Sequence, residues 1–358
     1  MGKKKNTRFF RGFAEYKTLG AEARRNMRRE FLINNALYMF LIVVIIAIAI
    51  SRPRFLSASS LINILSLSAA NLPIALGIAG AIILTGTDLS AGRAVGLTAC
   101  VGASLLQATG YANKMFPNLP ELPVFAVILL VVAIGAVIGA VNGFCTAKFN
   151  LHPFIVTLAT QLIIYGALLM YLTLGTNNGQ SISGLSEGYT RFINGSFLSL
   201  GRTAIPNFVW YSILITAVMW FVWNKTTFGK NMFAVGSNPE AAHVSGVNVT
   251  RTIILVFTLA GALYGVTGFI EGARIGSNSA STGLNYELDA IAACVIGGVS
   301  FVGGIGKIRG VIMGVVLLRI IFVGLTFLSV NQNMQYIIKG LIILIACAID
   351  MRKYLVRK

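Results

Sequence analysis

Long apolar runs alternate with short polar segments along almost the whole chain. A helix needs about 20 residues to cross the hydrocarbon of a bilayer, and most of these runs approach that length. The runs that predict membrane spans are residues 32–51, 69–86, 94–109, 124–147, 153–174, 208–223, 252–270, 289–302, 308–328 and 335–350. The pattern predicts an all-α, polytopic membrane helix bundle of about ten transmembrane helices.

Composition supports this prediction and excludes soluble classes of protein. Hydrophobic residues make up 56% of the 358 residues, charged residues make up only 11%, and the mean hydropathy is +0.79. An ordinary soluble domain has about 25% charged residues. A cytosolic enzyme, a secreted domain and a disordered chain are therefore excluded, and residues 32–350 are expected to form the membrane domain.

The net charge is +18, from 29 basic and 11 acidic residues, and its distribution argues against nucleic acid as a partner. Ten of the basic residues precede residue 30 and four lie in the last seven, which is typical of a membrane protein with both termini in the cytoplasm. We expect the basic tail at 1–31 and the basic C-terminus at 351–358 to be cytoplasmic. The tail either lies on an anionic lipid surface or is solvated.

The basic residues in the segments between the predicted spans support the same orientation in the membrane. With the first end inside, the segments expected inside carry 21 Lys and Arg residues, Arg93 among them, and those expected outside carry six. This split places residues 224–250 in the cytoplasm and residues 175–207 outside. No cleavable signal is expected, so the first span should remain as an anchor.

Glycines recur at every fourth position in two of the runs. Gly135, Gly139 and Gly143 form one such stripe, and a second stripe, at 306, 310 and 314, begins the run at 308–328. Small residues at this spacing let two helix backbones approach closely. The stripes predict a tight bundle and carry no information about a substrate.

The motifs of several catalytic mechanisms are missing from the sequence. The Gly-Lys pairs at 229–230 and 306–307 lack the flanking residues of a P-loop, so the chain is not expected to hydrolyse ATP. With two His residues and four cysteines scattered through apolar runs, a metal site is not expected. We therefore expect a transport protein rather than an enzyme, with no cofactor of its own.

Four carboxylates lie near the ends of the apolar runs: Asp88, Glu271, Glu287 and Asp289. A proton-coupled carrier would place carboxylates in the middle of its spans. These four lie beside polar turns, where a carboxylate can accept hydrogen bonds from helix N-terminal amides. We expect them to cap helices or fix loops rather than relay protons.

The inside segment 224–250 predicts a short helix over Pro239–Ser245. Asn238 is a good N-cap, Pro239 suits the first helical position, and Gly246 suits the end. A helix of two turns on a loop is only marginally stable by itself. This helix therefore needs a surface to pack against.

Three stretches of the chain stand out as long motifs: Thr85–Arg93 (TGTDLSAGR), Gly236–Val249 (GSNPEAAHVSGVNV) and Tyr286–Gly304 (YELDAIAACVIGGVSFVGG). They resemble the permease subunits of sugar ABC importers of the ribose/xylose/galactose type. The resemblance runs from about residue 35 to 350, and the first and third stretches are most similar to galactose/methyl-galactoside permeases.

The resemblance implies a permease subunit in the bacterial inner membrane that moves a monosaccharide by alternating access. It implies a second copy of the chain, a separate ABC ATPase subunit that binds ATP-Mg, and a periplasmic sugar-binding protein. It also implies that spans two to five and seven to ten are inverted repeats. Finally, it implies that the ATPase contacts the cytoplasmic loop at Asn238, Pro239, Glu240, Ala241, Ala242, Ser245 and Gly246.

Polar residues on apolar spans are candidates for the sugar path: Asn71, Asp88, Ser90, Asn142 and Gln161. Hydrogen bonding between helices is the alternative for each. Arg319 departs from the pattern of the family that the chain resembles, whose members usually carry a small or apolar residue there. We expect Arg319 either to pair with a carboxylate such as Asp289 or to extend into a central cavity.

Other functions stay open from the residues alone. The cargo could be another sugar or a nucleoside of the same family. A secondary carrier that works without an ATPase, or a membrane scaffold, would have the same hydropathy pattern.

Overall fold

The structure, a computed structural model, describes residues 25, 39, 42–43, 45–200 and 203–355. The chain divides into two compact units, Met1–Arg52 and Pro53–Lys358. In the first unit residues 45–51 are helical, in agreement with the end of the first predicted span. Apart from Arg25, the predicted cytoplasmic tail at 1–31 lies outside the described residues.

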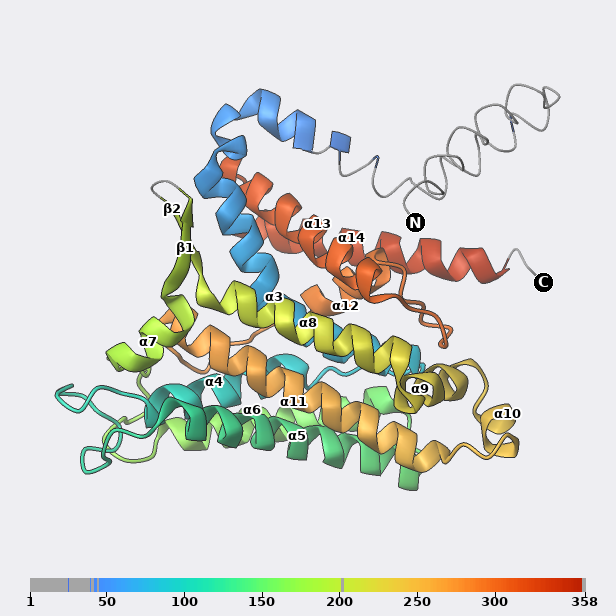
Figure 1. The fold of residues 1–358 in the computed structure, drawn as a ribbon, viewed down its shortest axis with the longest axis horizontal. Coiled ribbons are helices and arrows are strands. Elements are labelled where there is room, and N and C mark those ends of the chain that lie inside the picture. Colours follow the sequence, from blue (N-terminus) through green and yellow to red (C-terminus); the bar gives the residue numbers. More distant parts are fainter. Residues whose placement is uncertain (1–24, 26–38, 40–41, 44, 201–202, 356–358) are drawn as a thin grey trace, which may run out of the picture. The chain divides into compact units, whose positions relative to one another are not determined.

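The second unit is a helical bundle that carries a small β-hairpin (Figure 1). Its helices are η1 (Pro53–Leu56), α3 (Ala58–Ile83), α4 (Ala91–Leu105), α5 (Val124–Lys148), α6 (Pro153–Leu172), α7 (Glu187–Asn194), α8 (Asn207–Lys225), α9 (Thr227–Ser237), α10 (Pro239–Val244), α11 (Val249–Ile275), α12 (Tyr286–Ile296), α13 (Ile308–Phe327) and α14 (Gln332–Leu355). The hairpin pairs β1 (Ser196–Leu200) with β2 (Thr203–Pro206) in antiparallel fashion. Within the described ranges, six helices are long and apolar enough to cross a membrane. The predicted fold class, a polytopic all-α membrane bundle, is confirmed.

Most predicted spans coincide with observed helices, and the agreement is closest for α5 and α13. α3 begins well before the predicted residue 69 because Ser57 caps it, with its hydroxyl accepting a hydrogen bond from Ser60 N at 3.3 Å. Serines in the first turns of α3 lower the local hydropathy and hide this start. α14 continues to Leu355, into the segment predicted as a C-terminal tail.

The span predicted at 289–302 is wrong. α12 has only 11 residues, or about 16 Å at 1.5 Å per residue, roughly half the hydrocarbon thickness. The chain then turns instead of continuing the helix, and Gly298, Gly303 and Gly304 take positive φ angles. α4, with 15 residues, is also too short to cross a bilayer unaided.

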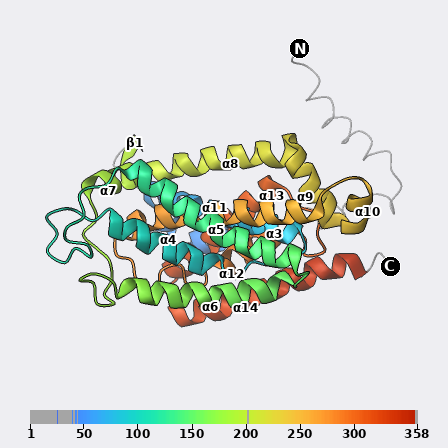
Figure 2. The same ribbon diagram turned by 90° about the horizontal axis from the view of Figure 1, so that it is seen from below.

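α3 and α11 form the centre of the second unit. Their most apolar windows are 67% and 61% buried, compared with 22% for α5 and 28% for α6. α11 packs against α4 and α5, and α3 packs against α12 and α13; in Figure 2 both central helices lie between α8 and α6. If α3–α6 and α11–α14 are repeats, then α3 corresponds to α11, α4 to α12 and α5 to α13. The two sets of contacts are then equivalent, so the packing agrees with the expected repeat.

The connecting segments gather at two ends of the bundle (Figure 1). α9 and α10 lie at one end with the turns that follow α3 and α12, where Gly304 N donates to Ile83 O at 2.9 Å. α7 and the hairpin lie at the other end. The segments 224–250 and 175–207 are thus at opposite ends, as the charge count requires, although α7, α9 and the hairpin were not predicted.

The first glycine stripe faces α11, as its spacing predicts. A Cβ atom on Gly139 would lie 2.0 Å from Phe257 O, and one on Gly261 of α11 would lie 2.1 Å from Gly135 O. In the second stripe, Gly310 and Gly314 of α13 face the last turn and the end of α12 in the same way, whereas Gly306 precedes α13 and faces the Ile83 side chain. Such contacts bring the two backbones together with no side chain between them.

Gly139→Ala should destabilise the protein by about 1–3 kcal/mol, because the new methyl group forces α5 away from α11. The thermal midpoint in detergent measures this. Gly166→Ala on α6 is the matched control, since a Cβ there meets nothing within 4 Å, and it should be neutral or slightly stabilising. Equal midpoints for the two variants would contradict the close packing of α5 on α11.

Candidate functional site

The first turns of α4 and α12 meet inside the bundle. A Cβ atom on Gly92, in the first turn of α4, would overlap the carboxylate of Glu287, in the first turn of α12. The segment 276–285 leads into α12 and runs beside α4, whose Cys100 Sγ is 3.7 Å from Ser279 O. Helix N-termini carry partial positive charge, so their meeting point favours acceptor groups.

Asp88 lies in the turn before α4 and organises the hydrogen bonds around its N-terminus. Its Oδ1 atom accepts from Ser90 N at 2.9 Å and from Ser90 Oγ at 2.6 Å, and its Oδ2 atom accepts from Tyr264 OH of α11 at 3.1 Å. The loop-fixing role expected for this carboxylate is confirmed.

The same network extends to α5 and α6. Ser90 Oγ accepts from Asn142 Nδ2 at 2.9 Å, and Asn142 Oδ1 accepts from Thr160 Oγ1 at 2.7 Å. Asp88, Ser90 and Asn142 are fully buried. Three of the five predicted path residues therefore do meet, but their polar atoms bind one another, which is the interhelical alternative considered for them.

The other two predicted path residues lie apart from this network. Gln161 is on α6 with its side chain partly exposed. Asn71 is on α3, is only 7% exposed, and lines a small cavity with residues of α12 and α13. A path role for these two residues stays a prediction.

A cluster of charges surrounds Asp289 of α12. Lys339 Nζ of α14 is 2.6 Å from Asp289 Oδ1, and an Arg319 guanidinium nitrogen of α13 is 3.5 Å from Asp289 Oδ2. The pairing of Arg319 with Asp289, one of the two outcomes expected, is confirmed. Lys339 was missed, although a lysine inside an apolar run has to be paired or solvated, and that is the signal that points to it.

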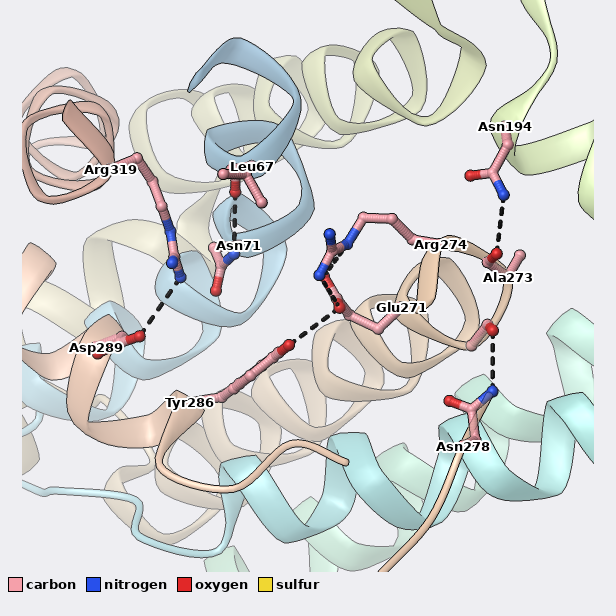
Figure 3. Close-up of polar contacts among 11 residues, drawn as sticks. Leu67, Asn71, Asn194, Glu271, Ala273, Arg274, Asn278, Tyr286, Asp289 and Arg319 are labelled. Atoms are coloured by element: carbon pink, nitrogen blue, oxygen red, sulfur yellow. Dashed lines mark hydrogen bonds and ion pairs between the residues drawn. The ribbon is translucent and has the colours of Figure 1, made fainter. Parts of the chain in front are cut away.

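A second ionic cluster joins the end of α11 to the start of α12 (Figure 3). Arg274 donates two hydrogen bonds to Glu271, at 2.9 and 2.7 Å, and Tyr286 OH donates to Glu271 Oε2 at 3.0 Å. Glu271 is fully buried, so this bidentate pair and the tyrosine satisfy its charge. Among the described residues, no three His, Cys, Asp or Glu side chains are grouped to hold a metal ion.

Arg93, which the charge count assigns to the cytoplasmic side, is half-buried in the first turn of α4. Its guanidinium donates to Ala280 O at 2.9 Å and lies 4.1 Å from the centre of the Tyr165 ring. The segment 276–285 thus brings a carbonyl to Arg93, and the assignment of this residue to the cytoplasmic side stays a prediction.

The predicted cytoplasmic helix is present as α10. Asn238 caps it by accepting from Ala241 N at 2.9 Å, Pro239 begins it, and Gly246 follows with φ +84°. The residues predicted to contact an ATPase are all exposed except Ala242, namely Asn238, Pro239, Glu240, Ala241, Ser245 and Gly246. Val244, at 88%, is also exposed. Their role in coupling stays a prediction.

Comparison with known proteins identifies the family that the chain matches. Residues 60–347 match the family described as "Branched-chain amino acid transport system / permease component". The chain is 47% identical over 328 residues to the galactose/methyl galactoside import permease protein MglC of Escherichia coli (strain K12), covering 92% of this chain and 97% of that protein.

The protein of the same name from Haemophilus influenzae is 46% identical, over 93% of this chain and 98% of that protein. The ribose import permease protein RbsC of Escherichia coli (strain K12) is 32% identical, over 94% and 99% respectively. No solved structure matches the chain.

Ser90→Ala should lower the free energy of unfolding by about 1–3 kcal/mol, because Asp88 and the Asn142 amide both lose a buried partner. Denaturation in detergent measures the change. Thr258→Val is the control, because the Thr258 hydroxyl donates only to Ile254 O of its own helix, at 2.7 Å. If both variants unfold like the unmodified protein, the Asp88 network does not stabilise the fold.

Proposed function

The chain belongs to the family of transport-system permease components that its residues 60–347 match, and on that premise we propose that it is the permease subunit of an ABC importer for galactose or methyl galactosides. The observation that carries the proposal is 47% identity over nearly the full length of a permease named for that cargo. The lower identity to the ribose permease, 32%, makes ribose the second candidate.

A separate ATPase subunit supplies the energy by binding and hydrolysing ATP-Mg, and it docks on the loop that contains α10. Two features support this. α10 is exposed on nearly all sides, including Glu240 and Val244, and a six-residue helix needs a surface to hold it. Such a helix has no evident purpose in a carrier that works without a partner, which is the rival function.

α9 connects this docking helix to the bundle. A Cβ atom on Gly236, near the end of α9, would lie 1.9 Å from Ile83 O, and one on Gly303 would lie 2.3 Å from Gly236 O. The turns after α3 and after α12 are therefore both in contact with α9. A push on α10 reaches both halves of the bundle, which suits alternating access.

The remaining parts of the proposal follow from this orientation. The end with α9 and α10 faces the cytoplasm together with both termini, and the end with α7 and the hairpin faces the periplasm, where a sugar-binding protein delivers the cargo. A second copy of the chain completes the pathway in the inner membrane. Sugar uptake that stops when ATP is depleted at constant membrane potential, and co-purification with an ATPase, test the proposal against a secondary carrier.

Glu240→Lys should reduce sugar uptake about tenfold while the ATPase continues to hydrolyse ATP, because the reversed charge lies on the exposed first turn that meets the partner. Uptake and ATP hydrolysis in reconstituted vesicles measure this uncoupling.

Glu187→Lys is the matched control for this variant. Glu187 is also exposed in the first turn of its helix, α7, at the other end of the bundle, so the cost to the helix dipole is similar. Uptake and ATPase binding that are both unchanged in Glu240→Lys would remove α10 from the coupling mechanism.

A further inference from the structure

A small cavity between α3, α12 and α13 combines polar and apolar walls. Its lining residues are Asn71, Asp289, Ala290, Ala293, Val315, Leu318, Arg319 and Phe322. None of them belongs to the Asp88 network or to the α10 loop. Mixed walls of this kind suit a sugar, whose C–H faces pack on apolar groups while its hydroxyls form hydrogen bonds.

Asn71 directs an unpartnered acceptor into this cavity. Its Nδ2 atom donates to Leu67 O, one turn earlier in α3, at 2.9 Å. Its Oδ1 atom is buried and has no hydrogen-bond partner among the residues that the structure describes. Figure 3 shows this oxygen turned away from Leu67, on the side where Arg319 and Asp289 lie. A buried amide oxygen without a donor is unfavourable, and a ligand hydroxyl would supply the missing hydrogen bond.

Arg319 provides hydrogen-bond donors on the facing wall, beside the acceptor carboxylate of Asp289. Asp289 is held tightly by Lys339, at 2.6 Å, and loosely by Arg319, at 3.5 Å. The longer contact exceeds the usual length of a charge-assisted hydrogen bond, so the guanidinium is the more exchangeable partner. Arg319 and Asp289 side chains are 17% and 13% exposed, unlike the fully buried Asp88.

We propose that this cavity is a contact site for the hydroxyls of the sugar in transit, with Asn71 Oδ1 accepting a hydrogen bond from one hydroxyl and Arg319 donating to the oxygen of a neighbour. The inference rests on the proposed transport of a sugar and names where the cargo meets the permease. The cavity now has room for about one water molecule. It therefore widens, by separation of α12 and α13 from α3, when the sugar passes.

Asn71→Leu tests the proposal in vesicles that contain the complete transporter, with an excess of binding protein fully loaded with galactose. The maximal transport rate should fall roughly threefold to tenfold, the loss expected for one hydrogen bond to the moving sugar. Stimulation of ATP hydrolysis by the loaded binding protein should persist, which shows that the complex is assembled. Asn71→Ala, which adds no bulk, should slow transport similarly and replaces the leucine variant if that one fails to assemble.

Ser212→Ala is the matched control. The Ser212 hydroxyl on α8 is also buried without a partner among the described residues, but it does not line the cavity, and its removal should leave the rate unchanged. A rate loss in Ser212→Ala as large as in Asn71→Leu would overturn the proposal, and so would unmodified rates in both Asn71 variants.

Singly deoxygenated galactoses identify the hydrogen bond itself. One of them should slow the unmodified transporter by the same factor as Asn71→Leu and should slow that variant no further. If every deoxygenated galactose slowed the variant and the unmodified protein by the same factor, the proposed hydrogen bond to Asn71 would be overturned. If the unmodified complex moves no galactose at all, the proposed cargo is wrong, and this outcome is distinct from a failure at Asn71.

Discussion

Backbone amides and carbonyls at membrane depth need partners inside the protein, and this constraint shapes the centre of the bundle. α4 and α12 are too short to cross, so the non-helical segments that lead into them must be covered. Before α4, Thr157 Oγ1 accepts from Leu89 N at 3.1 Å and donates to Thr87 O at the same distance. Before α12, the Arg93 guanidinium donates to Ala280 O at 2.9 Å. Glycines then allow these segments and helices to approach without intervening side chains.

The polar groups held by this scaffold fall into two kinds. The Asp88 network is closed, because each of its donors meets an acceptor within the network and Asp88, Ser90 and Asn142 are fully buried. Closed networks of this kind make a core rigid and specific. The cavity beside Asp289 is open by comparison: its charges are partly exposed, its ion pairs are unequal in length, and the Asn71 amide oxygen lacks a donor. The rigid network and the exchangeable contacts therefore lie in different places. The rigid network surrounds the start of α4, and the exchangeable contacts lie on the α13 side of α12.

The sequence predicts much of the fold and less of the site. A long uniform apolar run, such as that of α5, predicts the bounds of its helix directly. The signals at Asn238, Pro239 and Gly246 predict α10 almost to the residue. The half-length of α12 is invisible to hydropathy, because apolar turn residues follow it and prolong the run. The same holds for the site: Asp88 meets Tyr264, 176 positions later, through packing that leaves no local periodic signal. Asn71 and Arg319 stand out as polar residues in apolar runs, but only the structure places them on one cavity.

The position of α9 connects these parts mechanically. Its last residues lie between the turn after α3 and the turn after α12, in backbone contact with both. α3 carries Asn71 and α12 carries Asp289, so a displacement of the α9–α10 loop acts on both walls of the cavity at once. Backbone contacts transmit this displacement with little loss, since no flexible side chain lies between the elements and packed interiors are stiff. Both ends of α12 are fixed, the first by the hydrogen bond from Tyr286 to Glu271 and the second by the glycine turn that contacts α9. α12 is short, so it connects the turn that contacts α9 directly to Asp289 at the cavity. A push at one end of the bundle can therefore alter, through α12, a polar cavity in the interior of the bundle.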